Sequence, residues 1–109
     1  MKVLFDECVP WPLQALLPEH ECRTAQQMKW KQIKNGELLA LVEPQFDVFL
    51  TCDQNLRYQQ NLAGRRIAIL ELSTNKLRRL IAAAQVVREA VAGMERGEFR
   101  RLNIPDGLS

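Results

Sequence analysis

Two short apolar runs in this chain each lead into an aspartate, and they constrain the fold more than any other feature. Lys2–Phe5 leads directly into Asp6, and Val48–Cys52 leads directly into Asp53. Such runs are typical of buried strands, and a parallel sheet buries its strands on both faces. Because ligands bind at the carboxyl ends of parallel strands, the two aspartates are predicted to lie at the functional edge of an α/β sheet.

Strand-like and helix-like segments alternate along the chain, which predicts a single α/β domain spanning residues 1–109. Two further strands are expected at Glu21–Ala25 and Arg66–Leu72. They would give three layers, with a central parallel sheet of about four strands between helices. The tail at 99–104 alternates apolar and polar residues and is a candidate edge strand.

Helices are expected over 10–17, 35–43, 55–62 and 73–97, between or after the strands. Asn35 is a reasonable N-cap, which places Glu37 in the first turn of its helix. The last helix carries an apolar face from Leu77 to Val91. That face serves either as core or as the surface of a homodimer, and core is the expected use.

Composition argues against several classes of protein. The three cysteines show no paired spacing, so a zinc site or a disulfide framework is not expected. The apolar runs fall short of the ~20 residues that a membrane span needs. The first residues do not have the pattern of a signal peptide. A cytoplasmic protein without a membrane partner is therefore expected.

Charge is distributed unevenly, although the net charge is only +2. Residues 1–56 hold 5 basic and 8 acidic side chains, whereas residues 57–109 hold 10 basic and 5 acidic ones. An acidic front half and an arginine-rich back half suit a polyanionic substrate drawn toward a cation site. The alternative is that most of these arginines only solvate helix faces.

Candidate nucleic-acid contacts follow Asp53 along the chain. They are Arg57, Tyr58, Arg65 and Arg66. Arginine combined with an aromatic ring is the pairing that grips a single-stranded backbone and stacks a base. Arg57 is the strongest candidate, because it lies about one helical turn beyond the aspartate.

Three carboxylates are the candidate ligands for a divalent cation, namely Asp6, Glu37 and Asp53. Carboxylate oxygens are ligands that Mg²⁺ and Mn²⁺ prefer. If Glu37 faces the same sheet edge, the three acids would crowd one pocket, which is costly unless a cation compensates them. Asn55 adds an amide oxygen or orients a metal-bound water, so the candidate catalytic set is Asp6, Glu37, Asp53 and Asn55. Each acid taken alone is also explained by helix capping or by the helix dipole.

Three segments together resemble the minimal PIN-like family of small bacterial α/β domains. They are Val3–Glu7, Asn35–Leu39 and Phe49–Leu56, and the resemblance extends over nearly the whole chain. It implies RNA cleavage dependent on Mg²⁺ or Mn²⁺, with Asp6, Glu37 and Asp53 at the matching acidic positions. It also implies the toxin of a toxin–antitoxin pair, with an antitoxin protein as partner. The chain departs from the family pattern at Asn35 and Asn55, where acids are often found.

Two other functions stay open. A phosphorelay receiver domain also has an acidic pair after its first strand and an aspartate after its third, as Asp6-Glu7 and Asp53 do here. A receiver further needs a lysine after a fifth strand, which the long helix expected beyond Thr74 does not supply. A non-catalytic PIN-like fold would bind RNA or a partner protein without cleavage. Replacing Asp6 would distinguish it, because a binder should lose little.

Overall fold

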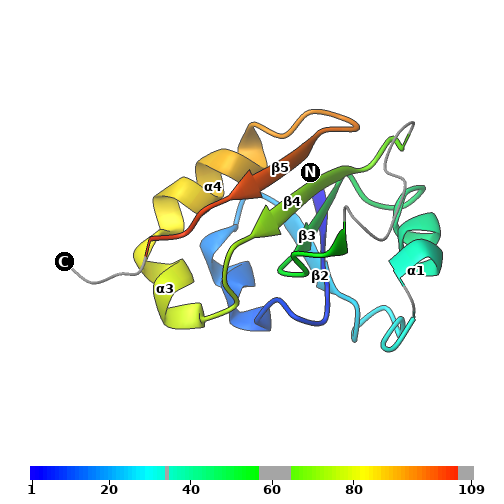
Figure 1. Ribbon diagram of the computed structural model, residues 1–109, viewed down its shortest axis with the longest axis horizontal. Coiled ribbons are helices and arrows are strands. Elements are labelled where there is room, and N and C mark those ends of the chain that lie inside the picture. The colour runs from blue at the N-terminus through cyan, green and yellow to red at the C-terminus, as the bar shows by residue number, and fades with distance from the viewer. Residues whose placement is uncertain (34, 57–64, 106–109) are drawn as a thin grey trace.

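The computed structural model describes residues 1–33, 35–56 and 65–105. Five strands in these ranges form one sheet in which every neighbouring pair is parallel (Figure 1). The spatial order is β2-β1-β3-β4-β5. The strands are β1 (Lys2–Phe5), β2 (Glu21–Thr24), β3 (Val48–Thr51), β4 (Ala68–Leu72) and β5 (Phe99–Leu102). The predicted parallel α/β sheet is confirmed, and the tail supplies its fifth strand at an edge.

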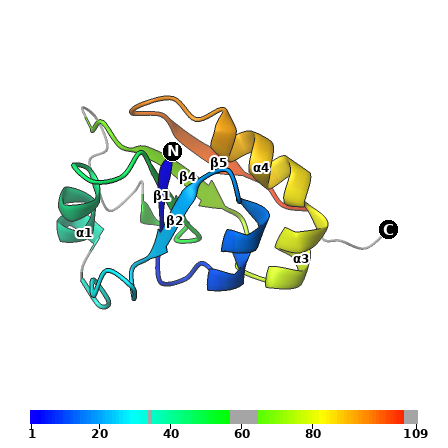
Figure 2. The same ribbon diagram turned by 180° about the vertical axis from the view of Figure 1, so that it is seen from behind.

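Alternate side chains of each strand enter two separate cores. Along β3, Val48 and Leu50 pack on one face of the sheet, while Phe49 packs on the other. The 3₁₀ helix η1 (Trp11–Leu16) and the helices α3 (Leu77–Ala82) and α4 (Ala84–Ala92) cover the first face. The helix α1 (Asn35–Val42) covers the second, and Figures 1 and 2 show it apart from the other helices. Coverage of both faces explains why β3 and β4 are continuously buried.

The segment expected to form one long helix over 73–97 instead forms two. The break is at Ala83, whose backbone N–H donates to the carbonyl oxygens of Arg79 and Leu80 over 3.1 and 3.2 Å. Ala83 is itself buried in the same core as Leu80 and Val87. The break therefore keeps the apolar sides of both short helices on the sheet. No proline or glycine marks this position in the sequence, so the helical pattern alone does not reveal it.

The apolar face predicted for this region is core in part. Leu80, Val87 and Val91 are fully buried, whereas Ile81 and Val86 are exposed. A homodimer through this face would therefore have only the exposed side chains to use. The helix expected over 55–62 falls mostly on residues outside the described ranges. None of the helices in the described ranges combines the length and apolarity that crossing a bilayer requires.

The connections after β1 and β3 lead to opposite faces of the sheet. The chain leaves β1 for η1 on the first face, whereas it leaves β3 for Leu56, which is buried on the second face. These two strands are neighbours in the sheet, with Val3 opposite Val48. Where adjacent connections diverge in this way, a crevice opens at the carboxyl edge of an α/β sheet. Asp6 and Asp53 lie beside this point.

Candidate active site at the carboxyl edge of the sheet

Asp6 and Asp53 are brought together at the β1–β3 edge. Burial is the main cause that raises the pKa of Asp6, and the negative charge of Asp53 raises it further. Hydrogen bonds from the Thr51 side chain, the Glu7 backbone and the Cys8 side chain oppose that rise in pKa. The two aspartates therefore lie close enough to interact electrostatically. Two like charges at a half-buried edge are the condition that a bound cation relieves.

One buried hydroxyl group connects the two aspartates. The Oγ1 of Thr51 donates to the Asp6 Oδ2 over 2.8 Å and accepts the backbone N–H of Asp53 over 3.0 Å. Thr51 has no exposed surface. The other oxygen of Asp6 accepts the backbone N–H of Glu7 over 2.8 Å. Asp6 is thus held by the last residue of β3 and by the residue that follows it in the chain, and Thr51 is a site residue that the sequence analysis did not identify.

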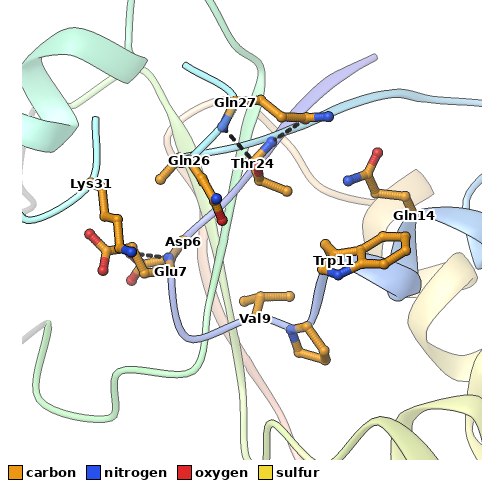
Figure 3. A pocket seen from close by; sticks show the side chains of 11 residues that line it. Asp6, Glu7, Val9, Trp11, Gln14, Thr24, Gln26, Gln27 and Lys31 are labelled. Carbon is orange, nitrogen blue, oxygen red and sulfur yellow. Dashed lines mark hydrogen bonds between the residues drawn. The ribbon is translucent and has the colours of Figure 1, made fainter. Parts of the chain in front are cut away.

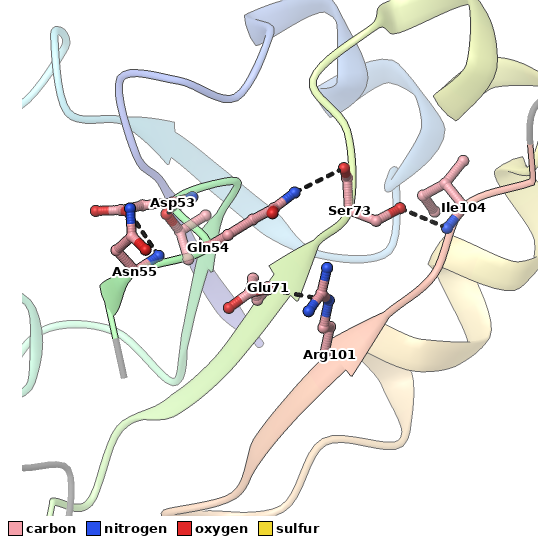
Figure 4. Close-up of polar contacts among 8 residues, drawn as sticks. Asp53, Gln54, Asn55, Glu71, Ser73, Arg101 and Ile104 are labelled. Carbon is pink, nitrogen blue, oxygen red and sulfur yellow. Dashed lines mark hydrogen bonds and ion pairs between the residues drawn. The ribbon is translucent and has the colours of Figure 1, made fainter. Parts of the chain in front are cut away.

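Asn55 lies next to Asp53 on the exposed side of this edge (Figure 4). Its backbone N–H donates to the Asp53 Oδ1 over 2.9 Å, as in an aspartate that caps a following turn. Asp53 therefore caps the turn that follows it, which is the alternative role that the sequence analysis gave to this residue. This bond occupies one carboxylate oxygen and does not prevent the carboxylate from binding a cation.

Glu37 does not join Asp6 and Asp53. It lies in the first turn of α1 as expected, but its side chain is exposed, because the helix directs Leu38, Leu39 and Val42 into the core. Within the described ranges, no three side chains of the histidine, cysteine, aspartate and glutamate types gather closely enough to hold a metal ion. The expected crowding of three carboxylates is wrong for this structure.

The candidate nucleic-acid contacts are divided by the fold. Arg57 and Tyr58 lie outside the described residues. Arg65 and Arg66 precede β4 and so lie at the amino edge of the sheet, opposite Asp53. The backbone N–H of Arg66 donates to the Glu43 Oε2 over 3.3 Å. Arg65 and Arg66 are therefore separated from Asp53, because in a parallel sheet the start of one strand is remote from the end of its neighbour.

An acid that the sequence analysis missed, Glu71, is buried within β4. It is 1% exposed and lies in register between Thr51 of β3 and Arg101 of β5. Its Oε2 is 3.3 Å from the Arg101 Nε, and neither carboxylate oxygen accepts a hydrogen bond from the described residues (Figure 4). The available signal was a charged residue inside the apolar run 69–72.

Two cysteines complete the edge. The backbone N–H of Cys52 donates to the Cys8 Sγ over 3.1 Å, and the Cys52 thiol donates to the Thr74 carbonyl oxygen over 3.3 Å. The neighbouring Cys52 side chain is the main cause that lowers the pKa of Cys8. All three cysteines are free thiols.

In comparisons with known proteins, no family model, no curated protein and no solved structure matches the chain significantly. The strand order 2-1-3-4-5 is shared by flavodoxin-like and receiver folds, and a shared fold does not establish a function. The receiver alternative gains a fifth strand from β5. It still lacks the lysine, because Asn103, Ile104 and Pro105 follow that strand.

Proposed function

We propose that this chain is a ribonuclease dependent on Mg²⁺ or Mn²⁺, which cleaves RNA phosphodiesters at the β1–β3 edge. The observation that supports the proposal is the convergence of Asp6 and Asp53 at the point where adjacent connections diverge. A buried threonine holds one carboxylate and the backbone of the other. A fold that needed these acids only as caps would have no reason to bury Asp6 at a cost to its charged form.

The donor set fits a hard divalent cation. Asp6 and Asp53 would supply carboxylate oxygens, and Asn55 would supply an amide oxygen. Mg²⁺ commonly keeps several waters and uses one or two carboxylates together with substrate phosphates, so two acids suffice. When bound, such a cation activates water and stabilises charge on the phosphate oxygens. Glu37 is left out of this ligand set because, among the described residues, it does not gather with Asp6 and Asp53.

The chain's own residues have positioning roles in this proposal. Thr51 fixes the Asp6 carboxylate, and through the Asp53 backbone it also fixes the turn that carries the second acid. Since Asn55 is exposed, its amide is accessible to an incoming phosphate or to water. The polyanionic substrate would be drawn to the edge by the cation together with the basic back half of the chain.

We further propose that the nuclease is the toxin of a toxin–antitoxin pair in the cytoplasm, as the resemblance to PIN-like domains implies. The antitoxin would insert a segment over the acidic edge. A basic side chain of that segment would then take the place of the cation between Asp6 and Asp53. This would explain how one surface serves both for catalysis and for inhibition.

Cleavage of end-labelled RNAs of varied sequence, in Mn²⁺ or in EDTA, tests the nuclease. Asp6→Asn and Asp53→Asn are expected to reduce cleavage at least ~100-fold, since loss of a ligand exceeds the 10- to 100-fold cost of losing an outer partner. Asp47→Asn is the matched control. Asp47 is an exposed acid at the opposite edge, where it accepts the Lys2 backbone N–H over 2.8 Å, and asparagine retains that acceptor.

Two results would count against cleavage by this edge. Cleavage that persists in Asp6→Asn would assign the activity to another site or to a contaminant. RNA binding without any cleavage, unchanged in Asp6→Asn, would instead support a non-catalytic binding domain.

A further inference from the structure

A cavity of about 650 Å³ opens directly beside Asp6, between the connections that follow β1 and β2. Its size lies within the range of small-molecule sites. Figure 3 shows Trp11 and Gln14 on one side of this cavity and Lys31 and Asp6 on the other. Among the residues that line this cavity, only Asp6 belongs to the proposed cation site. The other lining side chains have no function in the proposed cleavage.

Trp11 is a large flat side chain that the fold leaves exposed. It is 70% exposed, although Leu13 two residues later is fully buried. Pro10 precedes it and Pro12 follows it, so the backbone on both sides of the indole has restricted φ angles. An exposed indole on a restricted backbone offers a flat surface on which a planar ring can stack.

Glutamine side chains provide the polar groups of the cavity. The Gln27 Oε1 accepts the backbone N–H of Thr24 over 2.9 Å, and the Thr24 Oγ1 accepts the backbone N–H of Gln27 over 3.0 Å. This reciprocal pair fixes the Gln27 amide and leaves its NH₂ group as a donor. Gln26 also directs its amide into the cavity, and Gln14 lies beside the Trp11 ring (Figure 3).

The charge of the walls disfavours an anionic ligand. Asp6 and Glu7 contribute carboxylates, and Lys31 is the cation among the described lining residues. The Glu7 Oε1 accepts the backbone N–H of Gln32, which ties the β1 connection to the loop that follows β2. Two carboxylates on one wall disfavour a phosphate inside the cavity. A flat neutral ring with hydrogen-bonding groups at its rim would stack on the exposed indole, bind the amide side chains and bring no negative charge into the cavity.

We propose that this cavity is a nucleobase subsite, which takes the base of the nucleotide adjoining the phosphodiester held at Asp6. Trp11 stacks on the base, and the amides of Gln14, Gln26 and Gln27 bind its edge. Stacking on an aromatic ring combined with hydrogen bonds to the base edge is how proteins recognise single-stranded RNA. The proposal rests on the proposed function, because it takes single-stranded RNA as the substrate.

Binding measured without cleavage separates this subsite from the nuclease. Trp30→Phe leaves Trp11 as the sole tryptophan of the two in the chain, and it preserves a ring against Phe46. With Ca²⁺ in place of Mg²⁺ or Mn²⁺, so that a cation still offsets the carboxylates at this edge, short single-stranded RNA oligomers are expected to quench the fluorescence of Trp11. An oligomer of the same length with abasic positions, which retains the phosphates, is expected to quench it far less.

The affinity of fluorescein-labelled RNA, followed by anisotropy, gives the second readout. Trp11→Ala is expected to weaken binding about 10- to 100-fold, the usual effect of removing one stacking ring. Its melting temperature should stay that of the wild type, since the ring is exposed. Trp30→Phe is the matched control and should bind like the wild type. Gln26→Ala is expected to alter the preference among oligomers of different bases.

The outcomes distinguish the two proposals. Equal binding of the abasic and the ordinary oligomers, or unchanged affinity in Trp11→Ala, would overturn the subsite even if the chain cleaves RNA. Base-dependent quenching without cleavage in Mn²⁺ would support the subsite and count against the nuclease. Trp11 fluorescence that stays the same with every oligomer would also overturn the nucleobase subsite. The cavity would then bind another class of ligand, such as a peptide.

Discussion

The hydroxyl of Thr51 donates a hydrogen bond to the carboxylate of Asp6 over 2.8 Å, which joins the carboxyl ends of β3 and β1. The same oxygen accepts the backbone N–H of Asp53 over 3.0 Å. A single buried side chain therefore sets the spacing of the two acids proposed to bind the cation. Groups that orient metal ligands in this way tune affinity as well as geometry.

Thr51→Val is expected to destabilise the protein and to weaken the site. Valine keeps the shape but removes both hydrogen bonds, which leaves the Asp53 N–H without its acceptor, at a cost of about 1–3 kcal/mol. Mn²⁺ affinity should fall about 10- to 100-fold, as for other lost outer partners of a metal site. Urea unfolding and calorimetric titration measure the two effects. Thr51→Ser should restore Mn²⁺ affinity, and wild-type affinity in Thr51→Val would contradict the role of the hydroxyl.

Asp6→Asn is expected to stabilise the metal-free protein at neutral pH. Because the pKa of Asp6 is raised in the folded state, chiefly by burial, the folded protein holds this proton more tightly than the unfolded chain does. The corresponding stability is fully present below the unfolded pKa and is lost as pH rises through the folded pKa. Asparagine resembles the protonated side chain, so the variant should melt a few degrees higher at pH 7 in EDTA.

The gain in melting temperature should shrink as the pH falls toward and below the ordinary aspartate range of about 4, where wild-type Asp6 is protonated in both states. Asp47→Asn should show no comparable gain, because Asp47 is exposed. Saturating Mn²⁺ should reverse the order, since a ligand at 100 times its Kd stabilises the wild type by about 2.7 kcal/mol. A variant less stable than the wild type at pH 7 in EDTA would contradict the unfavourable burial of the charged carboxylate.

The strands could be predicted because burial on both faces leaves a direct record in the sequence. Val48–Thr51 is fully buried, and its run of apolar residues indicated a strand without any knowledge of its neighbours. The position of Asp6 and Asp53 at one edge followed from parallel pairing alone. The exposure of Glu37 could not be predicted in the same way, because it depends on which side of α1 faces the sheet.

The polar interior was harder to predict than the strands. Thr51 reads as an ordinary strand residue, and its bridging role exists only once β1 and β3 are in register. Glu71 looked like an interruption of an apolar run, and its ion pair with Arg101 needs β5 beside β4. Both are contacts between distant segments, which local sequence patterns do not contain.

Removing the partner of Glu71 should cost more than neutralising Glu71 itself. Glu71 is 1% exposed and its Oε2 lies 3.3 Å from the Arg101 Nε. Arg101→Met leaves a buried carboxylate without its cation, which is expected to cost about 1–3 kcal/mol, below the 3–5 kcal/mol of a fully buried pair because Arg101 is partly exposed. Glu71→Gln should cost less. Urea unfolding of both variants checks the order.

Combining the two substitutions is the control for this ion pair. If the cost of Arg101→Met comes from the unpaired Glu71 charge, adding Glu71→Gln should recover most of it. Costs that simply add would show that the pair contributes no coupling energy.

Glu37→Gln is expected to leave Mn²⁺ affinity within about twofold of the wild type, since an exposed surface change is usually worth under 0.5 kcal/mol. The side chain is exposed on α1, whereas Asp6 lies at the β1–β3 edge. A small loss of stability should accompany the change, because an acid in the first helical turn contributes about 0.3–1 kcal/mol through the helix dipole. Calorimetric titration alongside Asp53→Asn gives the comparison. A loss of Mn²⁺ affinity in Glu37→Gln as large as that in Asp53→Asn would show that Glu37 is a ligand of the cation.

Arg57→Ala is expected to weaken RNA binding and to reduce its dependence on salt. In sequence Arg57 follows Asp53 by about one helical turn, which favours a contact with the phosphate backbone near the acidic edge. Each lost contact with a single strand lowers the slope of log affinity against log salt by about 0.7. Arg66→Ala is the matched control, because Arg66 lies at the amino edge of the sheet. Affinity measured across salt concentrations should therefore change for Arg57→Ala and stay constant for Arg66→Ala. Equal slopes in the two variants would make Arg57 an ordinary surface residue.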